Sequence, residues 1–212
     1  MKAMIMAAGR GERLRPLTDV TPKPLLKVRG KPLIVHHLEA LATADFNEIV
    51  INLSWLGEQI RDQLGDGGAF GVTIEYSQEP EPLEVAGGVV QALDLLGDRF
   101  VVVNGDVLTD FDFARLRAAD SEAHLVLVPN PSHHPLGDFT FEHGRITGRD
   151  GSRHTYSGIA CFRRSFFAEC ARGRRALAPM LDAAAVDGKV TGELHCGLWQ
   201  DAGTPARLQA LG

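Results

Sequence analysis

The alternation of short apolar runs with helix-like stretches is the feature that most constrains how this 212-residue chain can fold. In the first half, the predicted strands are residues 3–8, 48–53, 72–76 and 99–103. The predicted helices are residues 32–41, 55–64 and 87–96. Strands separated by helices are typical of βαβ units, whose crossovers keep the strands parallel. We therefore predict a Rossmann-like α/β fold in which helices flank a mixed, mainly parallel sheet.

The second half has a different pattern, in which short strands are separated by turns. These strands are predicted at residues 123–129, 137–141, 145–148 and 155–162. A helix over 176–186, a last strand pair over 189–199 and a closing helix over 205–211 complete the prediction. Because no linker, repeat or low-complexity tract separates the halves, we predict a single domain over residues 1–212.

Charge and composition exclude several classes of partner. The chain has 22 Lys and Arg against 27 Asp and Glu, so it lacks the basic footprint of a nucleic-acid-binding protein. No apolar run approaches the ~20 residues of a membrane helix, and the first apolar run is too short for a signal peptide. Three cysteines without CxxC or zinc spacing suit a reducing compartment. We expect a cytoplasmic protein, favour a monomer, and expect neither nucleic acid nor membrane as a partner.

A glycine-rich loop follows the first predicted strand. Gly9 and Gly11 form a G-x-G, but Leu14 stands where a dinucleotide fingerprint requires its third glycine, and no P-loop motif is present. Three prolines within the next residues forbid a continuous helix. Glycines allow backbone N–H groups to approach an anion closely, so we predict a phosphate-binding loop. It is accompanied by five cations: Arg10, Arg13, Arg15, Lys23 and Lys27.

Residues 6–34, MAAGRGERLRPLTDVTPKPLLKVRGKPLI, closely resemble the signature L-A-A-G-x-G-x-R-x-x-P-L-T-x-x-x-P-K-P-L of the sugar-phosphate nucleotidylyltransferases. The resemblance continues in residues 81–88, 103–106 and 199–204, and so extends over nearly the whole chain. It implies the nucleotide-diphospho-sugar transferase fold, with the nucleotide bound by the first half and the sugar by strands of the second. Such enzymes join a nucleoside triphosphate to a sugar 1-phosphate and release pyrophosphate.

The resemblance implies a role for two cations and for the glycine loop. Arg13 and Lys23 correspond to the family residues that hold and neutralise the phosphates, and we predict them to be catalytic. No general base is expected, because the attacking phosphate oxygen is already ionised. The residues expected to bind the nucleotide are Ala8, Gly9, Gly11, Glu12, Arg13, Lys23, Glu79, Glu81, Gly87 and Gly88.

Recognition of the base is expected in residues 78–88. Uracil has one N–H donor, which Glu79 or Glu81 can accept, and Gly87 or Gly88 can let the backbone approach the ring. A carboxylate also suits the donors of guanine, so this region leaves the base open. Val85 stands where the family usually has a threonine.

Two aspartates match the metal ligands of the family. Asp106 follows the apolar strand VVVNGD and Asp201 lies in the WQDAGT segment, and the resemblance implies that both hold Mg²⁺. Magnesium usually takes one or two carboxylates together with water and substrate phosphates. The sugar phosphate is expected at Asn104, Asp138, Ser157 and Gly158, whereas His133 and His134 are expected at the surface or at the rim of the sugar site.

The expected substrates follow from the resemblance alone. The short length and the NGDV, GDF and SGI segments resemble most the family members that use UTP in the recycling of peptidoglycan sugars, so we expect N-acetylmuramic acid 1-phosphate as the sugar. The alternatives are mannose 1-phosphate with GTP, or glucose 1-phosphate with dTTP or UTP. A catalytically inactive sensor of nucleotide sugars is a more remote alternative.

Overall fold

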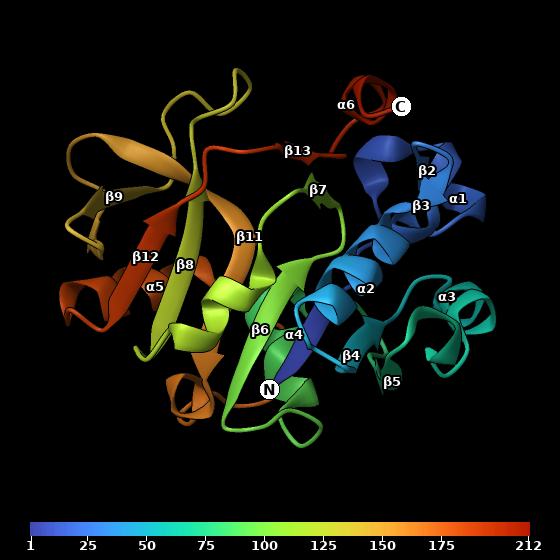
Figure 1. Cartoon of the computed structure of the whole chain (residues 1–212), viewed down its shortest axis with the longest axis horizontal. Coiled ribbons are helices and arrows are strands. Elements are labelled where there is room, and N and C mark those ends of the chain that lie inside the picture. The colour runs from blue at the N-terminus through green and yellow to red at the C-terminus, as the bar shows by residue number, and fades with distance from the viewer.

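A nine-stranded mixed sheet forms the centre of the computed structural model, which describes all residues from 1 to 212 (Figure 1). Its strands are β1 (Lys2–Met6), β4 (Glu48–Leu53), β5 (Thr73–Gln78), β6 (Arg99–Asn104), β8 (Ala123–Val128), β9 (Phe139–Glu142), β10 (Arg145–Gly148), β11 (Arg153–Arg163) and β12 (Val190–Leu194). Their order is β5-β4-β1-β6-β11-β8-β12-β10-β9. Only β10 and β11 run against the others. The predicted α/β fold with a mixed, mainly parallel sheet is therefore confirmed.

Helices and two small sheets surround the central sheet. The α-helices are α1 (Leu17–Val20), α2 (Leu33–Thr43), α3 (Gly57–Leu64), α4 (Glu84–Ala92), α5 (Ala178–Val186) and α6 (Pro205–Ala210). The two-stranded sheets are β2 (Lys27–Val28) with β3 (Lys31–Pro32), and β7 (Val107–Thr109) with β13 (Trp199–Asp201). Short 3₁₀ turns lie at Glu12–Leu14, Lys23–Leu25, Gly68–Phe70, Phe113–Ala118 and Arg164–Phe167. No helix has the length and apolar character needed to cross a membrane.

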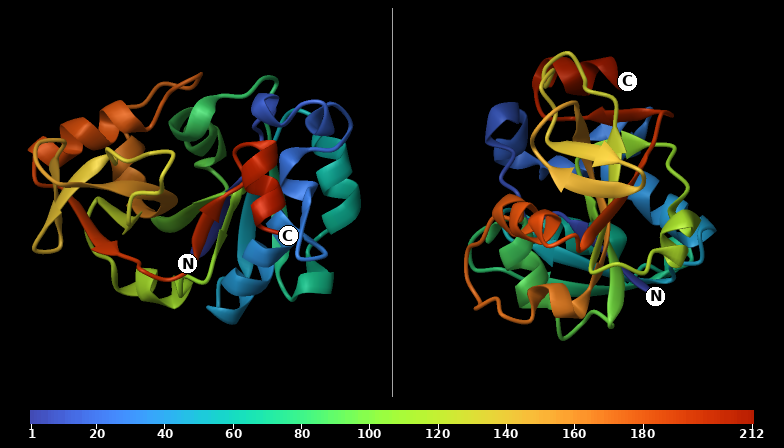
Figure 2. Two further views of the ribbon diagram at one scale, coloured as in Figure 1. Left: turned by 90° about the horizontal axis from the view of Figure 1, so that it is seen from above. Right: turned by 90° about the vertical axis from the view of Figure 1, so that its left-hand side faces the viewer.

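Alternate residues of the central strands enter two separate cores. In β1, Ala3 and Ile5 face the core under α2 and α3, whereas Met4 faces the core under α4 and α5. All three are fully buried. Because helices cover both faces, the strand has to be apolar throughout, which explains the continuous apolar run in the sequence. Figure 2 shows the helices on the two sides of the sheet.

The glycine-rich segment is helical only in short pieces. Prolines at 16, 22 and 24 divide residues 12–25 into the 3₁₀ turn Glu12–Leu14, the short helix α1 and the 3₁₀ turn Lys23–Leu25, so the predicted interruption of the helix is confirmed. The predicted helix after Pro32 is confirmed as α2. Helix α4 begins at Glu84, three residues before the predicted start, and ends at Ala92, four residues before the predicted end.

The expectation of a last strand pair within residues 189–199 is wrong. Strand β12 pairs with β8 and β10 of the main sheet, whereas β13 pairs with β7. The chain leaves the main sheet after Leu194 and crosses to β7, where the backbone of β13 finds its partner. This crossing brings residues 199–201 to the end of β6, and it is visible as the red segment between β12 and α6 in Figure 1.

Candidate functional site

A cleft of about 790 Å³ opens at the carboxyl ends of the parallel strands. Strand β1 lies between β4 and β6, so the chain moves to one side of β1 and later returns to the other. This reversal is the place where open α/β sheets bind ligands. The cleft is lined by residues 6–14, 23–24, 52, 79, 81–85, 105–106, 174 and 203. It therefore joins the predicted phosphate loop to the predicted base segment and to Asp106.

The glycine loop has a defined conformation. Gly11 has φ +65°, and a Cβ there would lie 2.8 Å from Cγ2 of Thr18. The Thr18 hydroxyl donates to the Gly11 carbonyl over 2.9 Å. At Gly9, by contrast, an added Cβ would meet nothing within 4 Å. Gly11 is thus required by the fold of the loop, whereas Gly9 leaves open space on the side of the cleft.

Trp55 anchors the loop from outside the motif. Its indole Nε1 donates to the Thr18 carbonyl over 3.0 Å. The guanidinium of Arg10 lies 5.0 Å from the centre of the Trp55 ring, a cation–π distance. Sequence reasoning missed Trp55, because nothing in the sequence relates it to the glycine loop.

A buried polar network fixes the point where β1 ends. Asn52 is 1% exposed, and its Oδ1 accepts from the Ala7 N–H over 2.7 Å. Its Nδ2 donates to Glu79 over 2.7 Å, and the other Glu79 oxygen accepts from the Leu83 N–H over 3.0 Å. Burial raises the pKa of Glu79, which the two hydrogen bonds oppose. The network connects the first residue of the loop to the segment that leads into α4.

Glu79 and Glu81 therefore lie in different environments. Both line the cleft, but Glu79 is buried with both oxygens bonded to the protein, whereas Glu81 is exposed. Sequence reasoning missed Asn52. Its side-chain amide is the only polar group among the buried residues of strand β4, and this feature of the sequence could have drawn attention to it.

Gly87 and Gly88 have a packing role in the structure, and their approach to the base stays a prediction. Neither residue lines the cleft. A Cβ on Gly88 would lie 2.7 Å from a Glu79 carboxylate oxygen, and one on Gly87 would lie 2.4 Å from the Gly173 carbonyl. Both glycines are needed because α4 packs closely against these two groups.

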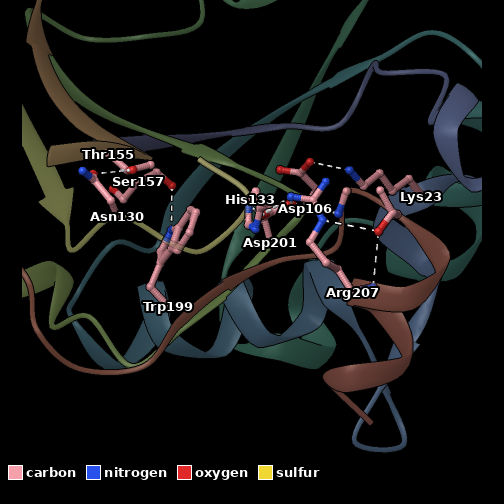
Figure 3. Close-up of polar contacts among 11 residues, drawn as sticks. Lys23, Asp106, Asn130, His133, Thr155, Ser157, Trp199, Asp201 and Arg207 are labelled. Carbon is pink, nitrogen blue, oxygen red and sulfur yellow. Dashed lines mark hydrogen bonds and ion pairs between the residues drawn. The ribbon is translucent and has the colours of Figure 1, made fainter. Parts of the chain in front are cut away.

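An ion pair joins Lys23 to Asp106 across the cleft (Figure 3). Lys23 is held between Pro22 and Pro24 in a 3₁₀ turn, and its side chain is 11% exposed. Asp106 follows Gly105, whose N–H donates to the Met6 carbonyl over 3.0 Å. A Cβ on Gly105 would lie 2.7 Å from that carbonyl, so only glycine allows this approach. The turn thus places Asp106 beside the end of β1.

Asp201 is brought next to Asp106 by the pairing of β13 with β7. The Ala202 N–H donates to the Asp106 carbonyl over 2.8 Å, although the two aspartates are far apart in sequence. The Asp201 carboxylate is held by Arg207 at 2.8 Å, by the Gly203 N–H at 2.9 Å and by His133 Nε2 at 3.0 Å. His133 therefore contacts a predicted metal ligand. Neither its contact with Asp201 nor that of Arg207 was foreseen.

The donor chemistry of these two aspartates fits Mg²⁺. Carboxylate oxygens are the ligands that Mg²⁺ prefers, and two of them suffice when water and substrate phosphates complete the shell. No group of three or more His, Cys, Asp or Glu side chains converges on one point. The two carboxylates therefore have the donor chemistry of a Mg²⁺ site in which water and substrate phosphates supply the other ligands.

Three of the four predicted sugar residues make contacts within the protein at β11: Ser157 and Gly158 belong to this strand, and Asn104 contacts Gly158. Ser157 is buried, donates to the Val126 carbonyl and accepts from the Ile159 N–H, so its hydroxyl hydrogen is already used within the sheet. Asn104 packs on Gly158, which has φ +81° and where a Cβ would lie 2.5 Å from Asn104 Nδ2.

Asp138 has polar partners of its own. One oxygen accepts from the Tyr156 N–H over 2.8 Å, and the other lies 3.1 Å from His134 Nε2. Neither Asp138 nor Asn104 lines the cleft, and their contact with a bound sugar stays a prediction.

Comparisons with known proteins identify the family of this chain. The family model for nucleotidyl transferases matches residues 2–141. The N-acetylmuramate alpha-1-phosphate uridylyltransferase of Neisseria meningitidis is 54% identical, over 99% of this chain and 96% of that protein. The mannose-1-phosphate guanylyltransferase of Mycobacterium tuberculosis is 33% identical over 96% of this chain, which spans only 61% of that protein.

A solved structure has the same fold. It is a Bacillus anthracis protein described as a glucose-1-phosphate thymidylyltransferase, in complex with sucrose. It superposes with a TM-score of 0.90 and 27% identity, over 100% of this chain and 93% of that one.

The Asn52 network predicts a loss of stability when the amide is removed. Asn52→Leu leaves the Ala7 N–H and a Glu79 oxygen buried without partners, which should lower the free energy of unfolding by about 2–4 kcal/mol. Urea unfolding measures the change. Asn47→Leu, at an exposed amide of the preceding turn, is the matched control and should change stability little. Equal stability of the two variants would contradict the role given to Asn52.

His37 on α2 predicts a pH dependence of stability. It is 2% exposed, its Nε2 has no partner, and burial lowers its pKa from 6.5 to about 4. Between these values the unfolded chain binds a proton that the folded chain does not, so stability falls as pH decreases from 6.5 towards 4.

The free energy of unfolding of wild type minus that of His37→Leu should therefore decrease by about 2 kcal/mol from pH 7.5 to pH 5 in urea unfolding. His143→Leu, at an exposed histidine, should show no such change relative to wild type. A constant difference for His37→Leu would show that His37 titrates alike in both states.

Proposed function

This chain belongs to the nucleotidyl transferase family, and on that premise we propose that it joins UTP to N-acetylmuramate α-1-phosphate and releases pyrophosphate. The observation that carries the proposal is the 54% identity to a uridylyltransferase of this substrate over almost the full length of both chains. The site supports it, because Lys23 pairs with Asp106 beside the phosphate loop and the backbone that follows Asp201 is bonded to Asp106.

The reaction requires the meeting of two phosphate groups. An oxygen of the sugar phosphate attacks the α-phosphorus of UTP, a P–O bond forms, and the bond to the β-phosphate breaks as pyrophosphate leaves. The nucleophile is already ionised, so the protein has to position the groups and neutralise their charge.

We propose that the glycine loop and two cations perform this task. Residues 8–11 line the cleft and Gly9 borders open space there, so backbone N–H groups of this loop are the proposed partners of phosphate oxygens. Arg13 lines the same cleft, is exposed and makes no ion pair within the protein, so it is free to bind the triphosphate. Lys23 exchanges part of its contact with Asp106 for the phosphate at which the attack occurs.

We propose that Asp106 and Asp201 hold Mg²⁺. The ion, when bound, would supply positive charge to phosphate oxygens as charge develops on them. Lys23, Arg207 and His133 contact the two carboxylates and hold them in place. Asp106 and Asp201 would then offer carboxylate oxygens to the ion from two backbone segments that the pairing of β7 with β13 holds side by side.

The proposed contacts to the base and the sugar are made by side chains that the fold does not already use. Of the two glutamates, we propose that Glu81 accepts the N3–H of uracil, since Glu79 supports the loop through Asn52. Asn104 and Asp138 remain the proposed sugar contacts. The reaction would return an amino sugar of the cell wall to its nucleotide form, in agreement with a role in peptidoglycan recycling in the cytoplasm.

The test of function is pyrophosphate release with Mg²⁺, over UTP, dTTP, GTP and ATP against the 1-phosphates of N-acetylmuramic acid, mannose and glucose. We expect turnover with UTP and N-acetylmuramic acid 1-phosphate. Turnover with GTP and mannose 1-phosphate instead would favour the function of the M. tuberculosis relative. Binding of nucleotide sugars without any turnover would favour a sensor.

Asp106→Asn tests the proposed metal role. Loss of the charge should lower kcat at least about 100-fold, since groups that act on charge in the transition state contribute at this level. Asp98→Asn, at an exposed carboxylate outside the cleft, is the control and should keep wild-type rates. Undiminished Mg²⁺-dependent turnover in Asp106→Asn would remove Asp106 from the metal site.

A further inference from the structure

A loop from the second half of the chain reaches the cleft at the wall formed by residues 81–85, at the start of α4. Residues 171–176 connect the last 3₁₀ turn to α5, and their backbone pairs with the start of α4. The Arg175 N–H donates to the Leu83 carbonyl over 2.9 Å, and the Gly87 N–H donates to the Arg175 carbonyl over 3.1 Å. Figure 2 (left) shows the orange loop extending towards the green segment.

Two glycines make this contact possible. A Cβ on Gly87 would lie 2.4 Å from the Gly173 carbonyl, so the loop and α4 touch at backbone distance. Gly173 itself has φ +126°, which side chains rarely adopt. The position of Arg174 is therefore set by a backbone that is held on both sides.

Arg174 is the residue of this loop that lines the cleft. Its Nε donates to Glu84 over 2.8 Å, and its two Nη groups make no hydrogen bond within the protein. The side chain is 70% exposed, and a pair of this kind contributes little stability. The guanidinium can therefore leave Glu84 for a ligand at small cost.

The neighbouring wall offers a pyrimidine base no side-chain donor, and its only donors are backbone N–H groups at the start of α4. The cleft residues 81–85 are Glu, Pro, Leu, Glu and Val, none of which has a side-chain donor. The Leu83 N–H is already bonded to Glu79. Uracil has two carbonyl oxygens to satisfy, and a guanidinium both donates to carbonyls and stacks on flat rings.

We infer that Arg174 contacts the base of the bound nucleotide and donates to a uracil carbonyl from the loop that pairs with the start of α4. The inference rests on the proposed function, which it deepens by assigning a base contact to a residue far from the nucleotide-binding half in sequence. Arg13 and Lys23 serve the phosphates from the other wall, so Arg174 acts on the base and not on the phosphates.

Equilibrium binding by titration calorimetry tests the inference, with UTP and with inorganic tripolyphosphate as ligands. Arg174→Ala should weaken UTP binding roughly tenfold, the loss expected for one base contact, and leave tripolyphosphate binding unchanged. Arg172→Ala is the matched control, because Arg172 lies in the same loop but pairs with Asp94 outside this cleft. It should bind both ligands as wild type does.

Equal UTP affinity of Arg174→Ala and Arg172→Ala would overturn the inference, and so would an equal loss for UTP and tripolyphosphate. In both cases binding of UTP to the wild-type chain would keep the proposed function. Failure of wild type to bind UTP would instead reject the proposed function, and this inference with it.

Discussion

The place of β1 between two parallel neighbours is the constraint on which the rest of the site depends. Because β4 and β6 run in the same direction as β1, all three strands end at one edge of the sheet. Where the chain leaves β1, its buried backbone N–H groups need hydrogen-bond partners, and Asn52 accepts the N–H of Ala7 at that point. The glycine loop begins at this residue, so the geometry of the phosphate site follows from how this strand ends.

Charge balance then explains how the acidic groups coexist in the cleft. Asp106 is paired with Lys23 and Asp201 with Arg207, so each carboxylate proposed to bind Mg²⁺ is held by a cation of the protein itself. Glu79 has no such cation, and its burial is compensated only by hydrogen bonds. A cleft that keeps pairs of opposite charge can accept a triphosphate and a metal ion by exchanging partners, without bringing an isolated charge out of water.

Local patterns account for what could be predicted. The apolar run of β1, the proline that precedes α2 and the glycine-loop motif act through neighbours in sequence, and the structure has them where we expected. Gly87 and Gly88 also stand out in the sequence, but their role depends on Gly173 and Glu79, which approach from other elements. The same holds for Ser157, whose hydroxyl is consumed by the neighbouring strand β8.

The sequence by itself determined the fold class, the family and the residue types available for phosphate and metal chemistry, because strand periodicity and a long motif are properties of contiguous residues. Only the tertiary structure decided which distant residues meet. The pairing of β13 with β7 brings Asp201 to Asp106, and the loop on α4 brings Arg174 to the cleft. These contacts depend on backbone hydrogen bonds between segments far apart in the chain. Because backbone groups are the same in every residue except proline, such bonds produce no recognisable sequence pattern in either segment.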